Sequence, residues 1–200
     1  MGLTSATARR HAQRTGDGQR RTDLSVTFTK SEWFVHPDAD VAVLPMAGKP
    51  ASLSRLGTPP LFASFKHEMF PSIEDMQYIE AFEDVIFVGF PQGLWDKTNK
   101  TPTVRRGITA TAIWQDYMGE PAFLNDGAVF PGNSGGPALI VDRNGFFGPK
   151  GFEIGRIRTI LLGVVAQSTS IQIGSALQPA SIATVVKWTR VLEALSLVEN

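Results

Sequence analysis

The sequence predicts an all-β fold, a barrel or sandwich that ends in one C-terminal α-helix. Short runs of β-branched and aromatic residues recur along the chain, and clusters of Gly, Pro, Asn and Asp separate them. In the stretch Ala180–Leu197 the apolar pattern changes to a helical period over a broad face. Many strands followed by a single helix argue against alternating βαβ units.

The first ordered element is expected at Asp23–Lys30, where apolar and polar residues alternate as in a half-buried strand. A short helix is expected within Ser72–Phe82, and Asn144-Gly145 predicts a hairpin turn. The other expected strands are Val41–Leu44, Asp84–Phe90, Thr103–Trp114, Pro137–Val141 and Thr159–Ala166.

The composition is that of an ordinary globular protein. Of its 200 residues 42% are hydrophobic, and 19 basic residues balance 19 acidic ones, which gives no electrostatic case for nucleic acid or an anionic membrane. Five arginines fall within residues 1–22, a stretch expected to be disordered. The absence of cysteine excludes disulfides and thiolate catalysis, and no signal peptide or membrane span is recognised. A cytoplasmic location is therefore expected.

The strongest chemical signal is Gly132-Asn133-Ser134-Gly135-Gly136-Pro137, which leads into the apolar run Ala138–Val141. Glycines allow a tight backbone path that exposes the Ser134 hydroxyl. Such a path can also aim the backbone N–H groups of Gly132 and Ser134 at one point, as stabilisation of an oxyanion requires.

This stretch resembles the nucleophile loop of the trypsin-like, chymotrypsin-fold serine peptidases, above all their cysteine-free bacterial members. His36–Leu44 is similar to the family's aspartate segment, in which Asp precedes a short buried strand. The resemblance makes Asp40 the triad carboxylate, buried and oriented toward an imidazole. Asp38 is the alternative by proximity, although no apolar strand adjoins it.

The resemblance implies a double β-barrel. Residues 23–200 would be the peptidase domain, in which 23–80 are the remnant of a first barrel, 81–178 a second barrel and 180–198 the terminal helix. The N-terminal half is expected to be truncated, because only ten residues precede the first histidine where the family has strands.

Substrate contacts follow from the same resemblance. Leu162–Gln167 is similar to the strand whose edge pairs with an extended peptide, which makes Ala166 and Gln167 substrate-binding residues. Ala128 falls at the base of the primary specificity pocket. Because it is not a carboxylate, a Lys or Arg preference is not supported, and small or apolar side chains are expected.

The general base is the weakest part of the constellation. In the family order His, Asp, Ser, only His11 and His36 precede Asp40. His36 is too close to Asp40 to belong to a separate loop and is interpreted as a surface or packing residue, while His67 lies downstream and is interpreted as incidental. The base is therefore either His11 or absent.

The implied function is a serine endopeptidase that acts on an extended polypeptide through an acyl-enzyme on Ser134, without metal or organic cofactor. Three alternatives remain open: an inactive relative that binds peptides, a structural remnant without ligand, and an esterase. The esterase is disfavoured because Ser134 leads into a strand rather than the helix of a nucleophile elbow. The oligomeric state is not predicted.

Overall fold

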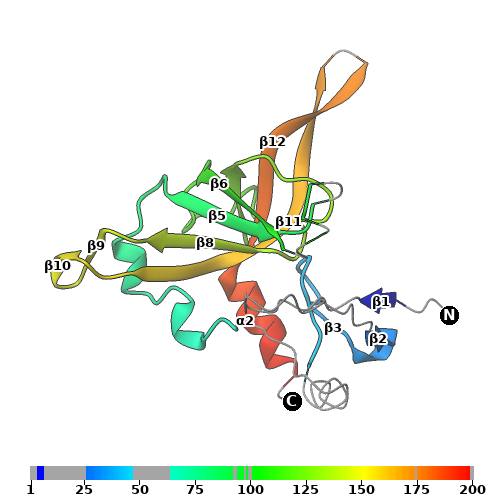
Figure 1. The fold of residues 1–200 in the computed structure, drawn as a ribbon, viewed down its shortest axis with the longest axis horizontal. Coiled ribbons are helices and arrows are strands. Elements are labelled where there is room, and N and C mark those ends of the chain that lie inside the picture. The colour runs from blue at the N-terminus through cyan, green and yellow to red at the C-terminus, as the bar shows by residue number, and fades with distance from the viewer. Residues whose placement is uncertain are drawn as a thin grey trace.

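The computed structural model describes residues 4–6, 26–46, 64–91, 94–96, 98, 101–173 and 175–198. These residues form one closed six-stranded antiparallel β-barrel, followed by a C-terminal α-helix (Figure 1). Around the barrel the strands follow the order β11-β12-β7-β6-β5-β8. Their bounds are β5 Asp84–Gly89, β6 Thr103–Thr109, β7 Ala122–Asp126, β8 Pro137–Asp142, β11 Arg158–Ile173 and β12 Ala176–Lys187.

The remaining elements are short and lie outside the barrel. Three two-stranded antiparallel sheets pair β1 with β2, β3 with β4, and β9 with β10. The strands are β1 Thr4–Ala6, β2 Val26–Phe28, β3 Phe34–Val35, β4 Ala42–Val43, β9 Gly145–Gly148 and β10 Gly151–Ile154. The helices are the 3-10 turns η1 Lys30–Glu32, η2 His67–Met69 and η3 Asp75–Gln77, and the α-helix α2 Trp188–Ser196.

The barrel is filled by side chains that alternate along its strands. In β5 the buried residues are Val85, Phe87 and Gly89, and the intervening Ile86 and Val88 are only partly buried. This alternation is the expected consequence of a strand with one face toward a core. The buried apolar cluster comprises Ile79, Val85, Phe87, Ile113, Phe123, Val129, Ala138, Ile140, Ile160, Leu162, Val165, Ala183 and Val185.

The double barrel expected from the sequence is not found in the described residues, which contain one barrel. Between residues 26 and 80 the described strands are β2, β3 and β4, of two or three residues each. Such strands offer too few ladder hydrogen bonds to close a barrel, for which strands near five or six residues are usual. The strand expected at Val41–Leu44 is reduced to β4, whose Ala42 is exposed rather than buried.

Of residues 1–22, expected to be disordered, the structure describes only 4–6. These form β1, which pairs with β2, with Ser5 opposite Thr27. Residues 7–25, which carry the five arginines, and the loop 48–60 lie outside the described residues.

The terminal helix begins at Trp188, eight residues later than the expected start at Ala180. Residues 182–186 belong to β12, which pairs with β7 on one side and β11 on the other. Val185 and Val186 are both buried because this strand is covered on both faces. A continuous apolar run of that kind resembles a helical face in sequence, and β-branched residues favour the strand.

Two further expectations were only partly correct. Asn144-Gly145 is not the hairpin turn, because β9 and β10 pair around Pro149-Lys150, with Gly148 opposite Gly151. The helix expected within Ser72–Phe82 is limited to η3. The hairpin β9–β10 lies at the end of the barrel where β8 ends (Figure 1).

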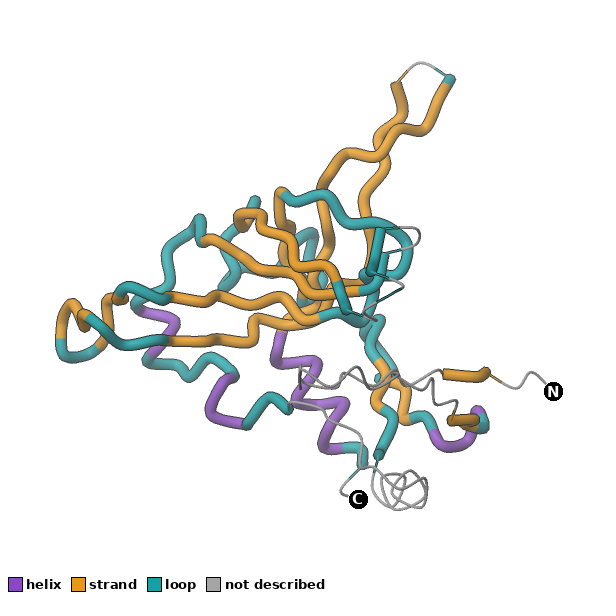
Figure 2. Tube along the Cα trace, in the orientation of Figure 1, coloured by secondary structure: helices purple, strands orange, loops and turns teal. Residues whose placement is uncertain are grey.

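β11 and β12 continue beyond the barrel as a two-stranded ribbon (Figure 2). The pairing of β11 with β8 ends at Val164, whereas its pairing with β12 continues to Ile173. Two register shifts, after Val165 and after Ser168, bend this ribbon. The outer edge of β11 is therefore released from β8 at Val165.

Candidate functional site

Ser134 lies in a turn between the loop that follows β7 and the start of β8, and it is exposed. Two glycines make this turn sterically possible. Gly132 has φ +99°, and a Cβ there would lie 2.5 Å from the carbonyl oxygen of Phe90. A Cβ at Gly136 would lie 2.4 Å from the carbonyl oxygen of Val88. The turn thus packs directly on the end of β5, as the glycine pattern predicts.

The backbone N–H groups of the turn divide into two sets. Asn133 N–H donates to the Phe130 carbonyl, Gly135 N–H to the Val165 carbonyl at 2.7 Å, and Gly136 N–H to the Asn133 carbonyl. In the described part of the chain, the N–H groups of Gly132 and Ser134 donate no such bond. Among the described residues, the two donors expected to form an oxyanion hole are thus the two N–H groups of this turn without a protein acceptor.

A pocket of about 230 Å³ lies at Ser134. Its walls include Val129, Phe130, Pro131, Ser134, Val165 and Gln167, none of which is charged. The guanidinium of Arg105 lies 4.9 Å from the centre of the Phe130 ring, outside these walls. Ala128, expected at the base of the specificity pocket, is partly buried and does not line this pocket.

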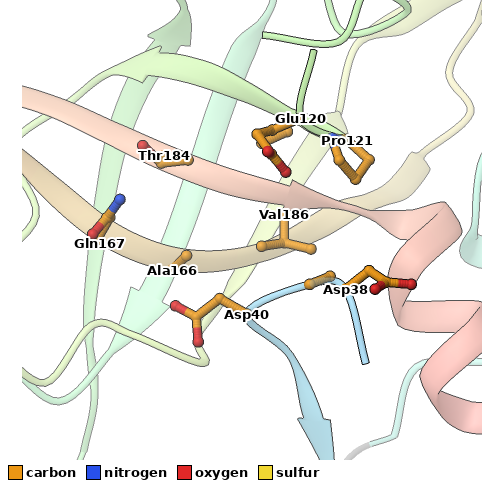
Figure 3. A pocket seen from close by; sticks show the side chains of 10 residues that line it. Asp38, Asp40, Glu120, Pro121, Ala166, Gln167, Thr184 and Val186 are labelled. Atoms are coloured by element: carbon orange, nitrogen blue, oxygen red, sulfur yellow. The ribbon is translucent and has the colours of Figure 1, made fainter. Parts of the chain in front are cut away.

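Asp40 lines a second pocket of about 190 Å³, together with Asp38, Glu120, Ala166, Gln167 and Thr184. Figure 3 shows Asp40 beside Ala166, whereas Asp38 lies nearer to the C-terminal helix. Asp40 is exposed, which corrects the expectation of a buried carboxylate. The reason is that the β3–β4 ladder is too short to cover it: β3 ends at Val35 and β4 begins at Ala42, so Asp40 lies in the turn between them.

Gln167 lines both pockets, so Ser134 and Asp40 lie near the same segment of β11. On the Ser134 side, Val165 accepts a hydrogen bond from Gly135 and donates one to the Gly136 carbonyl at 2.9 Å. On the other side, Ala166 lines the pocket of Asp40. Ser134 and Asp40 thus line two separate pockets, which border the same segment of β11 at Gln167.

His36 is a packing residue, as one reading of the sequence had it, and is 6% exposed. Its Nε2 lies 2.8 Å from Oε2 of Glu193 in α2, and its Nδ1 accepts a hydrogen bond from the backbone N–H of Asp38 at 3.1 Å. Because Nδ1 accepts, the proton is on Nε2, which donates to the carboxylate. Both ring nitrogens are therefore engaged in hydrogen bonds, and His36 does not line the Ser134 pocket.

Glu193 also pairs with Arg190 one turn earlier in α2. The hydrogen bond from Arg190, followed by that from His36, lowers the pKa of the Glu193 carboxyl below its ordinary value. The ionised carboxylate is the form that both donors favour. This cluster joins α2 to the segment after β3, which leads to Asp38 and Asp40.

Of the other two histidines, only His67 belongs to the described residues. His67 lies in η2, where its ring contacts Phe70 edge-on at 6.0 Å, and it lines neither pocket. His11, the candidate base, lies outside the described residues. Across the described ranges no group of His, Asp and Glu is arranged to hold a metal ion, and no helix is long and apolar enough to cross a bilayer.

The sequence did not indicate Glu120 or Thr184, which line the Asp40 pocket. Glu120 lies in the turn before β7, and Thr184 lies in β12. The sequence predicts neither β7 nor β12 as a strand. No motif surrounds either residue. Their position in the Asp40 pocket follows from the pairing of β7 with β12, in which Leu124 lies opposite Thr184.

No protein-family model, curated protein or solved structure matches this chain.

Proposed function

We propose that the chain is a serine endopeptidase that hydrolyses peptide bonds through an acyl-enzyme on Ser134. The observation that carries this proposal is the pair of backbone donors, Gly132 and Ser134, left unused beside an exposed serine hydroxyl. Two free backbone donors beside an exposed serine hydroxyl and a pocket are the parts that an oxyanion hole requires.

In the proposed mechanism the Ser134 hydroxyl attacks the scissile carbonyl, while a histidine accepts its proton and later returns it to the leaving amine. The developing oxyanion accepts hydrogen bonds from Gly132 and Ser134. His11 is the proposed base, and Asp40 is proposed to orient it from its place beside Ala166. The barrel of β5 to β12 is proposed to correspond to the second barrel of the trypsin-like peptidases, working in the cytoplasm.

The substrate is proposed to be an extended polypeptide. The outer edge of β11 is released from β8 immediately beside Ser134, and a peptide backbone is proposed to pair there with Ala166 and Gln167. The uncharged walls of the Ser134 pocket favour a small or apolar side chain next to the cleaved bond.

The test is labelling of the purified protein with a fluorophosphonate probe, followed by intact mass measurement. We expect one label on the wild type, none on Ser134→Ala, and labelling slowed by roughly 10⁴-fold or more in His11→Ala. His67→Ala, a histidine outside both pockets, is the matched control and keeps the wild-type rate. A folded wild type that takes no label contradicts the proposal.

The second candidate is a peptide-binding module without catalysis. It is favoured by one observation: among the described residues no histidine lines the pocket of Ser134 or that of Asp40. This alternative predicts that the wild type binds extended peptides but reacts with the probe no faster than His11→Ala does. The same labelling experiment, combined with a peptide-binding measurement, separates the two functions.

A further inference from the structure

A larger groove lies away from Ser134, between the β9–β10 hairpin and the segment 77–83. Its volume is about 490 Å³, more than twice that of either pocket beside Ser134 or Asp40. It is lined by Tyr78, Glu80, Glu83, Phe146, Phe147 and Phe152, among others. A volume of this size is in the range of ligand-binding clefts.

The hairpin side of the groove carries exposed aromatic side chains. Phe147 and Phe152 lie opposite each other in β9 and β10, with ring centres 5.0 Å apart, and they are 63% and 54% exposed. Ile154, two residues after Phe152 in β10, and Ile157 are also exposed, at 77% and 72%. Contiguous exposed apolar residues of this kind usually mark a site of interaction.

The charges in the groove select the kind of partner. Arg158 is already engaged: its Nε donates to Asp142 at 2.8 Å, and its guanidinium lies 4.4 Å from the centre of the Phe146 ring. Glu80 and Glu83 add two carboxylates to this neutralised pair, so the groove is net negative when both are ionised. An apolar partner with a positive charge would match both properties of the lining.

The environment of Glu83 supports this reading. Partial burial raises the pKa of its carboxyl, and the charges of Asp142 and Glu80 raise it further, although the backbone N–H of Glu80 donates to it at 2.8 Å. The charge of Arg158 lowers the pKa of Glu83, but the guanidinium is hydrogen-bonded to Asp142 and does not pair with Glu83. A cation bound in the groove would stabilise the ionised form of Glu83.

The groove is separate from the proposed peptidase site. β8 begins at Pro137, just after the Ser134 turn, and ends at Asp142 in the groove wall. Five steps along a strand at about 3.4 Å each place roughly 17 Å between the two ends. Figure 1 shows the hairpin at the far end of β8 from the start of the β11–β12 ribbon.

We propose that the groove between the β9–β10 hairpin and the segment 77–83 is a binding site for a peptide segment that presents a Lys or Arg side chain next to an apolar one. The apolar side chain packs on Phe147 and Phe152, and the cation lies at Glu80 and Glu83. The site does not depend on the chemistry of Ser134, so it binds whether or not the chain is a peptidase.

The test uses Ser134→Ala protein, so that no peptide is cleaved, and a fluorescein-labelled peptide Gly-Leu-Arg-Leu-Gly followed by fluorescence anisotropy. The control peptide carries citrulline, an uncharged analogue of arginine of the same shape. We expect the arginine peptide to bind roughly tenfold or more tightly than the citrulline peptide, and to weaken by a similar factor in Glu80→Gln/Glu83→Gln. Binding weakens as the pH falls and Glu83 takes up a proton.

Phe152→Ser is expected to weaken both peptides, while Glu74→Gln and Phe65→Ser, at exposed positions that do not line the groove, leave binding unchanged. Circular dichroism confirms the fold of each variant, and if Phe152→Ser does not fold, the two glutamate substitutions decide the matter. Equal binding of the two peptides, or no binding of either, overturns the proposal. Self-association of the protein that Phe152→Ser abolishes would also overturn it, in favour of a contact between copies.

Discussion

Gly132 combines two constraints that can be measured separately. Its φ of +99° is unfavourable for any L side chain, and its Cβ position is blocked by the Phe90 carbonyl. We expect Gly132→Ala to lower the free energy of unfolding by about 2–4 kcal/mol, of which about 1–2 kcal/mol is backbone strain. Urea denaturation measures this loss.

Gly119 offers the matched control, because its φ is +81° but a Cβ there would meet nothing within 4 Å. Gly119→Ala is expected to show the strain alone, about 1–2 kcal/mol. Equal losses in the two variants would mean that the turn shifts away from Phe90, and that the packing of the Ser134 turn on β5 is not rigid.

Glu83 makes a pH-dependent contribution to stability. Because burial raises its pKa in the folded state, the folded protein binds more protons than the unfolded chain over the interval between the two pKa values. Stability therefore falls as the pH rises from the unfolded pKa through the folded one. Glu83→Gln removes this loss, and its side-chain oxygen can still accept from Glu80 N–H.

We expect Glu83→Gln to be more stable than the wild type at about pH 7.5. At about pH 4 this advantage is lost, because the Glu83 carboxyl of the wild type is then largely protonated in both the folded and the unfolded state. Urea unfolding at the two pH values is the measurement. Glu74→Gln, at an exposed position, is the control. A constant difference between wild type and Glu83→Gln at the two pH values would contradict the assignment.

Among the elements, α2 is joined to the segment after β3 through His36. Replacing this buried histidine by alanine removes the contact with Glu193 and leaves the Asp38 N–H without its acceptor. We expect His36→Ala to lower the free energy of unfolding by about 1–3 kcal/mol, as measured by urea denaturation.

Because the same segment leads to Asp40, His36→Ala should also slow probe labelling of Ser134 if Asp40 takes part in catalysis. His67→Ala, which removes a histidine from a surface 3-10 turn, should change neither quantity. Full stability of His36→Ala would show that α2 is held by its apolar contacts alone, through residues such as Trp188 and Ala194.

For the whole molecule, the barrel and the N-terminal segments differ in how they are stabilised. Every member of the buried core cluster lies between Ile79 and Val185, and all six barrel strands lie between Asp84 and Lys187. We therefore expect a chain shortened to residues 64–198 to fold and to unfold cooperatively. Thermal unfolding followed by circular dichroism tests this.

The shortened chain lacks His36 and Asp40, so it should be less stable than the full chain and should not label at Ser134 at the full-length rate. A broad, non-cooperative transition would mean that residues before 64 form part of the barrel core. Full labelling would mean that neither His11 nor Asp40 is needed for the reactivity of Ser134.

Much of the barrel could be predicted from the sequence because its strands have local signals. β5 and β8 are dense in β-branched and apolar residues and were found close to their actual bounds. β7 and β12 were missed because Ala122–Asp126 has little β propensity and residues 180–187 share their apolar pattern with a helix. Only the pairing with neighbouring strands shows that these two segments are strands.

The sequence by itself determined the Ser134 turn and the single terminal helix, because glycine spacing and helical period are local properties of the chain. Tertiary structure decided that one barrel closes in the described residues, that Asp40 is exposed beside Ala166, and that His36 binds Glu193. These outcomes depend on contacts between residues far apart in the chain, which strand pairing fixes and which no local pattern encodes.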